Sequence, residues 1–271
     1  MRRLSLIPPL ALLALLAVAP AGAAGPATLK LATTTSTVDT GLFDVLLPAF
    51  ERRCGIAVRV LSVGTGKALK LAENGDVDVV LVHSRRAEEE FLAKGVGTNP
   101  VDVMHNDFVI AGPAADPAGV AATKTAAEAF AAIARAGAAF ASRGDRSGTH
   151  DRELELWGRA GVATFGAWRL ETGQGMGATL RLAGEKGAYL LADRATWLAQ
   201  GAASGLKLLF EGGDDLLNRY RVIVVHPARH PRANYVEAMT FAGWITSPEG
   251  QGAIRDFRKN GRALFVPDFV K

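Results

Sequence analysis

The 271-residue sequence predicts an α/β fold. Segments with helical apolar spacing alternate with short strand-like runs along the whole chain, a pattern typical of proteins built on a largely parallel sheet. Residues 77–82 form a run of β-branched side chains that suits a buried parallel strand. Roughly 245 residues remain once an N-terminal leader is set aside, which is enough to bury a sizeable core.

The individual elements follow from apolar spacing and from the residues that end each segment. Phe43, Leu46 and Phe50 recur at helical spacing, and Gly55 is expected to end that helix. The predicted strands cover residues 29–32, 58–61, 77–82, 108–112, 138–141, 188–191 and 220–225. The predicted helices cover residues 43–53, 67–73, 88–94, 126–135, 151–159, 178–184, 233–245 and 250–259.

Two of the predicted strands suggest a division into lobes. The strands at 108–112 and 220–225 flank an Ala- and Gly-rich middle section and could cross between two lobes. One lobe would then comprise residues 24–109 and 222–271, and the other residues 110–221. A single α/β domain of this size is the alternative that length alone allows.

The first 23 residues predict a cleavable secretory signal. Arg2 and Arg3 precede an uninterrupted apolar run at 10–18, and Ala21-Gly22-Ala23 fits the small-x-small cleavage rule. The alternative is an uncleaved anchor, but the run falls short of the ~20 apolar residues that span a bilayer. We therefore expect export to the periplasm.

Cysteine and charge content narrow the class of protein further. Cys54 is the only cysteine, so an intrachain disulfide is excluded, and it lies too far from the leader to carry a lipid anchor. The net charge of +4, less Arg2 and Arg3 of the leader, leaves about +2 for the mature chain. This balance gives no indication of a nucleic-acid partner, which usually requires a strong basic patch.

Four turns rich in glycine and hydroxyl side chains each lie between a strand-like and a helix-like segment. They cover residues 33–37, 62–67, 142–149 and 172–177. Each turn alone could be a helix cap or a tight turn. Ligands of open α/β sheets, however, bind beyond the carboxyl ends of the strands, where such turns lie. Four of them in one chain therefore favour a ligand site.

The turn at 142–149 indicates what that ligand is. It combines Arg143 with two glycines and the hydroxyls of Ser147 and Thr149, just before a helical segment. Free backbone N–H groups and the positive end of the helix dipole favour anions at such a position. Arginine adds a fork of donors that stays charged at physiological pH. The sequence thus predicts a site for a small oxyanion.

Catalytic alternatives are less well supported. Residues 64–68 resemble the end of a phosphate-binding P-loop, but Leu61 replaces its first glycine and Ala68 its magnesium-binding hydroxyl. The histidines are scattered, with no carboxylate cluster at metal-ligand spacing. We therefore expect a binding protein without cofactor or metal, and keep a phosphate-ester hydrolase as the less favoured alternative.

Several motifs carry a resemblance to a known family. They are Ala32-Thr33-Thr34-Thr35-Ser36, Leu46-Leu47-Pro48-Ala49-Phe50, Val63-Gly64-Thr65-Gly66, Asn106-Asp107-Phe108-Val109-Ile110, Ser142-Arg143-Gly144-Asp145, Ser147-Gly148-Thr149, Glu171-Thr172-Gly173-Gln174-Gly175-Met176-Gly177 and Ser247-Pro248-Glu249-Gly250-Gln251. With them the chain resembles the periplasmic tungstate-binding proteins of ABC importers, a branch of the phosphate- and molybdate-type binding proteins. The resemblance covers nearly the whole mature chain.

The resemblance implies a two-lobed, type II-like binding protein with two crossover strands. It implies a monomer that delivers tungstate to a membrane permease powered by a cytoplasmic ATPase. The implied contacts to the anion are Thr34, Thr35, Ser36, Ser62 and Thr65 from one lobe and Arg143, Ser147, Thr149, Gly175 and Met176 from the other. Which hydroxyl of each run makes contact stays open.

The ligand's identity also leaves alternatives. Molybdate is nearly isosteric with tungstate, and sulfate or phosphate are further candidates. A phosphate site gains from a carboxylate that accepts the phosphate proton, whereas a carboxylate repels an unprotonated dianion. We expect Asp145 to turn away from the cleft and to pair with Arg143 or Arg146.

Overall fold

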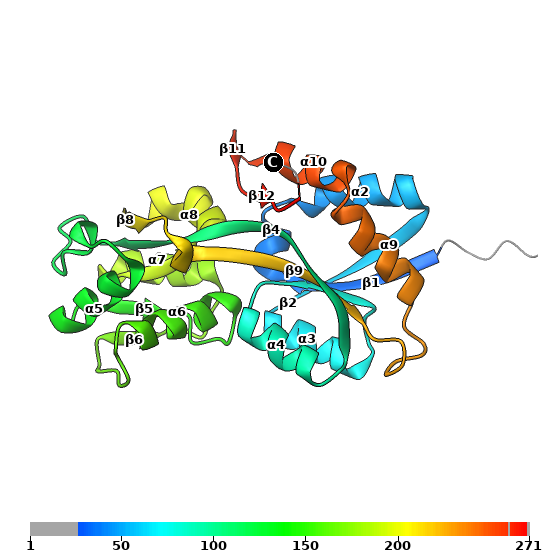
Figure 1. Ribbon diagram of the computed structural model, residues 1–271. Coiled ribbons are helices and arrows are strands. Elements are labelled where there is room, and N and C mark those ends of the chain that lie inside the picture. The colour runs from blue at the N-terminus through cyan, green and yellow to red at the C-terminus, as the bar shows by residue number, and fades with distance from the viewer. Residues whose placement is uncertain (1–26, 260, 270–271) are drawn as a thin grey trace, which may run out of the picture.

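The computed structural model describes residues 27–259 and 261–269, and the predicted leader lies outside this range. Two lobes lie side by side, joined by the long strands β4 (Gly97–Gly112) and β9 (Leu217–Val225) (Figure 1). The predicted α/β class and two-lobed architecture are confirmed. Within the described residues, no helix has the length and apolar character needed to span a membrane.

The first lobe is a sheet covered by helices on both faces. Its strands run in the order β12-β4-β9-β3-β1-β2, where β12 is the short strand Val266–Pro267. Strand β1 is parallel to β2 and β3, and β9 is antiparallel to β3. The bounds are β1 Ala27–Thr34, β2 Ile56–Val63, β3 Val79–Val82, α1 Thr35–Asp39, α2 Phe43–Cys54, α3 Thr65–Asn74, α4 Arg85–Ala93, α9 Tyr235–Ile245 and α10 Pro248–Asp256. As predicted, Gly55 ends α2, with φ 69.

The second lobe is formed by the middle of the chain. Its strands β7 and β8 both pair antiparallel with the far end of β4, while β5 and β6 form a separate parallel pair. The bounds are α5 Ala126–Ala136, β5 Phe140–Ser142, α6 Gly148–Arg159, β6 Arg169–Glu171, α7 Met176–Lys186, β7 Leu190–Asp193, α8 Arg194–Gln200 and β8 Lys207–Glu211.

The two crossover strands are longer than predicted. β4 spans Gly97–Gly112 and β9 spans Leu217–Val225, and they pair antiparallel between Gly97 and Asp107. Pro100 and two register shifts interrupt the pairing, which is why the first half of β4 shows no clean strand pattern in the sequence. The predicted lobe boundaries at 109/110 and 221/222 fall inside these strands and stay a prediction.

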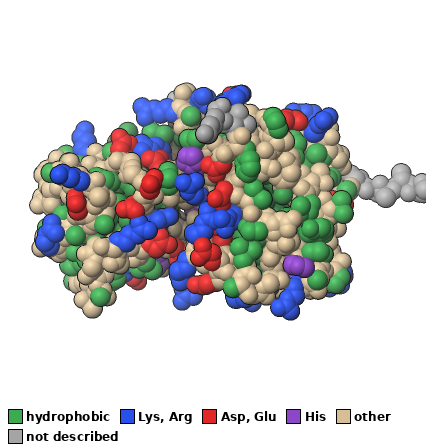
Figure 2. All heavy atoms as spheres, in the orientation of Figure 1, with side chains coloured by type: hydrophobic (Ala, Val, Ile, Leu, Met, Phe, Trp, Pro, Cys, Tyr) green, Lys and Arg blue, Asp and Glu red, His purple; other side chains and the backbone are tan. Residues whose placement is uncertain are grey.

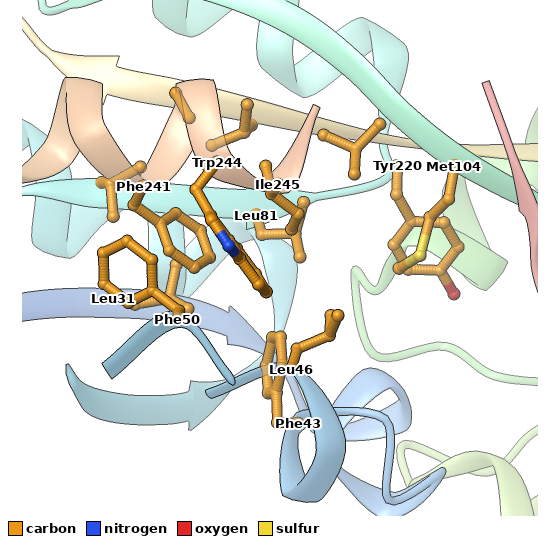
Figure 3. Packing of buried hydrophobic residues seen from close by; sticks show 14 of the residues in the cluster. Leu31, Phe43, Leu46, Phe50, Leu81, Met104, Tyr220, Phe241, Trp244 and Ile245 are labelled. Atoms are coloured by element: carbon orange, nitrogen blue, oxygen red, sulfur yellow. The ribbon is translucent and has the colours of Figure 1, made fainter. Parts of the chain in front are cut away.

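Strand alternation divides the core of the first lobe into two layers. Leu29, Leu31 and Leu81 face a layer built with α2, α9 and α10, whereas Val80 and Val82 face the layer beneath α3 and α4. Figure 3 shows aromatic rings filling the first layer. There Phe50 meets Phe241 edge-on with ring centroids 5.2 Å apart and lies 5.5 Å from Trp244.

Some elements depart from the sequence-based expectation. The last helix ends at Asp256 instead of residue 259, because Phe257 is extended and Lys259 pairs with Arg262 in a two-stranded sheet. The short strand β12, Val266–Pro267, then pairs with β4. Helix α8 was missed, although Asp193 caps it by accepting from the Thr196 amide at 2.8 Å.

Candidate oxyanion-binding site

The four predicted turns converge on one cavity of about 650 Å³ between the lobes. Each lies between a strand and a helix, as predicted, following β1, β2, β5 and β6. Helices α6 and α7 begin at Gly148 and Met176, earlier than the spacing predicts, so the turn residues are themselves the first helical residues. The cavity is lined by Thr34, Thr35, Asp39, Thr40, Gly64, Thr65, His83, Arg143, Asp145, Ser147, Gly148, Thr149, Gly175, Met176, Gly177, Ala178, Arg181, Ala195, Thr196, Ala199, Gln200 and Lys259.

Among the longer helices that start at the cavity, α3 and α7 lack a side-chain cap. Gly64 precedes α3 and Gly175 precedes α7, and neither position offers a side chain to the first-turn amides. A helix leaves its first N–H groups without intrahelical partners, so these donors remain available to a ligand. Both helices have at least ten residues, and their dipoles add partial positive charge at the cavity.

Arg143 is held rigidly at the cavity floor. It is 7% exposed, its Nε donates to the Gln174 carbonyl at 2.8 Å, and its Nη2 is paired with Asp145. Its Nη1 has no hydrogen-bond partner among the described residues. A guanidinium fixed through two nitrogens can present the third to an anion without loss of side-chain entropy.

The predicted pairing of Asp145 with Arg143 is confirmed, but Asp145 also lines the cavity. This corrects the expectation that it turns away. One carboxylate oxygen faces the Arg143 guanidinium and the other accepts from the Ser147 amide at 3.1 Å. The carboxylate is therefore occupied by donors of its own turn, which explains how it can remain beside an anion site.

Thr65 supplies a buried hydroxyl with no partner in the protein. The residue is 1% exposed, lines the cavity, and its Oγ1 makes no hydrogen bond with any described residue. Thr34 differs, because its Oγ1 lies 2.6 Å from the Thr37 hydroxyl. An unpaired buried hydroxyl is costly, so Thr65 points to a ligand that completes its bonding.

Eight of the ten predicted contact residues line the cavity. Ser62 is exposed in β2 and is not among the lining residues. Ser36 lies in α1, and its side chain falls outside what the structure describes. The contacts themselves stay a prediction for all ten residues.

His83 was missed as a lining residue. It follows β3 and is buried, and its Nδ1 lies 2.9 Å from Asn218 Oδ1. Asn218 in turn donates to Asn106 and Tyr220, so its oxygen faces the histidine and Nδ1 carries the proton. Burial lowers the pKa of His83 to about 4, with Arg143 as a further lowering influence. A solitary histidine after a strand gives no signal of this position in the sequence.

The lobes touch beside the cavity. Asp151, in the first turn of α6, accepts from Ser84 Oγ at 2.5 Å and from Arg86 Nη2 at 3.2 Å, and both donors belong to the start of α4. Figure 2 shows charged side chains of both signs gathered where the two lobes meet. The described structure is therefore closed on this side of the cavity.

Comparison with known proteins identifies the family. A profile described as the PBP superfamily domain matches residues 21–249. The tungstate-binding protein TupA of Peptoclostridium acidaminophilum is 43% identical over 245 residues, covering 89% of this chain and 86% of that protein. The chain belongs to the TupA family of the PBP superfamily.

Solved TupA-family structures share the fold. The tungstate-binding protein TupA from Desulfovibrio alaskensis G20 superposes with a TM-score of 0.78 at 46% identity, covering 89% of this chain and 99% of that one. A tungstate ABC transporter structure from Geobacter sulfurreducens gives a TM-score of 0.77 at 52% identity, covering 85% and 98%. The two-lobed arrangement is thus common to this chain and its relatives.

Gly148 is expected to be essential for the closed arrangement. An alanine Cβ there would lie 2.7 Å from His83 Nδ1 and 3.2 Å from the His83 carbonyl oxygen, across the lobe boundary. Gly148→Ala should therefore hold the lobes apart and increase the radius of gyration in small-angle scattering. Gly158→Ala in the same helix, where a Cβ meets nothing within 4 Å, is the control. An unchanged scattering profile for Gly148→Ala would contradict the contact.

The low pKa of His83 predicts a pH dependence of stability. The folded protein keeps His83 neutral down to about pH 4, whereas in the unfolded chain the histidine takes up a proton near its ordinary pKa of 6.5. Stability should therefore fall as the pH is lowered from 6.5 to about 4, by up to about 3 kcal/mol from this residue. Urea unfolding at several pH values should show a shallower loss for His83→Gln than for the wild type. Equal slopes for the two proteins would refute the assignment.

Proposed function

We propose that this protein is the periplasmic solute-binding component of an ABC importer, and that it captures tungstate in the cavity between its lobes. Membership of the TupA family supports the ligand class. The observation that carries the proposal is the donor character of the cavity: Arg143 Nη1, the uncapped starts of α3 and α7, and the unpartnered Thr65 hydroxyl. All these groups can donate hydrogen bonds to a small anion.

The hydrogen bonds of the Asp145 carboxylate favour tungstate or molybdate over phosphate as the ligand. Both of these dianions are unprotonated near neutral pH, so every oxygen only accepts hydrogen bonds. A protonated phosphate would need an acceptor, and the carboxylate of Asp145 is already oriented toward other donors, with one oxygen facing Arg143 and the other accepting from the Ser147 amide.

Binding is proposed to proceed by lobe closure without chemistry on the ligand. The anion meets the donors of one lobe first, and bending of β4 and β9 brings up the other lobe. The contacts of Ser84 and Arg86 with Asp151 then hold the lobes together. Closure excludes water and strengthens each charge-assisted bond. The closed protein would dock on the membrane permease.

Molybdate would satisfy the same donors as tungstate, since it has the same number of oxygens and the same charge. Calorimetric titration of ligand-free protein with tungstate, molybdate and phosphate tests the proposal directly. We expect strong binding of tungstate and no competition from phosphate at equal concentration. Preferential binding of phosphate would overturn the assignment.

Arg143→Ala is expected to weaken tungstate binding by about 100-fold or more, because a charge-assisted hydrogen bond in a closed cavity is lost. Arg146→Ala removes the same charge from the exposed end of the same turn and serves as the control. Calorimetry should show near-wild-type affinity for the control only. Near-wild-type affinity in Arg143→Ala would remove Arg143 from the site.

Thr65→Val tests the unpartnered hydroxyl. Tungstate affinity should fall about tenfold or more, since a hydrogen bond to a charged ligand is lost. The ligand-free protein should be at least as stable as the wild type, because the hydroxyl that is removed has no partner among the described residues. Thr240→Val, in α9 and outside the cavity lining, should leave the tungstate affinity unchanged. A marked loss of ligand-free stability would point to a structural role for Thr65.

A further inference from the structure

The charged residues that line the cavity form two groups, one buried at its floor and one closer to solvent. At the floor, Arg143 is 7% exposed and is paired with Asp145, so these two charges largely compensate each other. His83, also at the floor, is neutral near physiological pH because burial lowers its pKa to about 4. The floor therefore offers hydrogen-bond donors and little net charge to an approaching dianion.

Three further charged residues line the cavity closer to solvent: Arg181, Lys259 and Asp39. Arg181 is exposed on α7 of the second lobe and forms no ion pair within the described part of the chain. Lys259 comes from the first lobe and donates to the Asp39 carbonyl oxygen at 2.7 Å, with no carboxylate within ion-pair distance among the described residues. Two cations thus face the same cavity from opposite lobes.

We propose that Arg181, supported by Lys259, draws the dianion into the open cleft, while the buried donors determine how long it stays. This inference rests on the proposed function. The mature chain carries a predicted net charge of only about +2, which gives little attraction from the protein as a whole. The mouth carries two cations, Arg181 and Lys259, against the one carboxylate of Asp39, and this local excess of positive charge attracts the dianion.

The exposure of Arg181 separates its role from that of Arg143. An exposed charge interacts through solvent over about one Debye length, roughly 8–10 Å at physiological ionic strength, and affects the encounter rate. A buried donor in contact with the ligand mainly affects dissociation. Arg181 therefore acts on association, and its influence must decrease as salt is added.

Stopped-flow measurement of tungstate binding to the full mature protein, at several ionic strengths, tests this role. For Arg181→Gln the association rate constant should fall about three- to tenfold at low ionic strength, while the dissociation rate constant changes less than about twofold. The dependence of the association rate on salt should become shallower. Arg181→Glu should lower the rate further, and Arg181→Lys should restore it, since charge and not shape is required.

Lys186→Gln is the matched control, because it removes one positive charge from the last turn of the same helix, away from the cavity lining. Its association rate should equal that of the wild type. An unchanged rate for Arg181→Gln at low salt, or a loss confined to the dissociation step, would overturn the inference while leaving the proposed function in place. Absence of tungstate binding by the wild type in calorimetry would instead remove the proposed function, and this inference with it.

Discussion

Donors for a small dianion must be left unpaired by the protein, and such groups are costly to bury. This constraint accounts for much of the architecture. The uncapped starts of α3 and α7 and the buried Thr65 hydroxyl face the cavity at the boundary between the lobes, where a ligand can complete their hydrogen bonding. Arg143 meets the same constraint differently, because two of its nitrogens are satisfied within the protein and one is not.

The strands that connect the lobes also carry a buried polar network. Asn218 of β9 joins Asn106 of β4, Tyr220 and His83, directly behind the cavity. The rings of His83 and Tyr220 also pack against each other, with centroids 4.7 Å apart. This buried polar network links the two crossover strands through the bond from Asn218 to Asn106 and places His83 against the start of α6. The cavity floor and the connection between the lobes are therefore one continuous structure.

Local patterns in the sequence predicted much of the fold. The β-branched run before His83 became β3, and the glycines at 55 and 75 end their helices in the left-handed conformation. The first half of β4 was missed because Pro100 and the register shifts break its alternation. The end of the chain was missed because its short strands are stabilised by pairing with β4 and with each other, which no local pattern records.

The sequence by itself determined the α/β class and the four strand-to-helix turns, because helix starts, glycine turns and hydroxyl runs are local features. It also predicts that the turn around Arg143 binds an anion. Tertiary structure alone decided that these turns meet at one cavity, that Asp145 lines it with both oxygens occupied, and that His83, Arg181 and Lys259 join it. His83, Arg181 and Lys259 lie far apart along the chain and belong to no sequence motif. Their proximity follows from the two lobes closing on each other across β4 and β9.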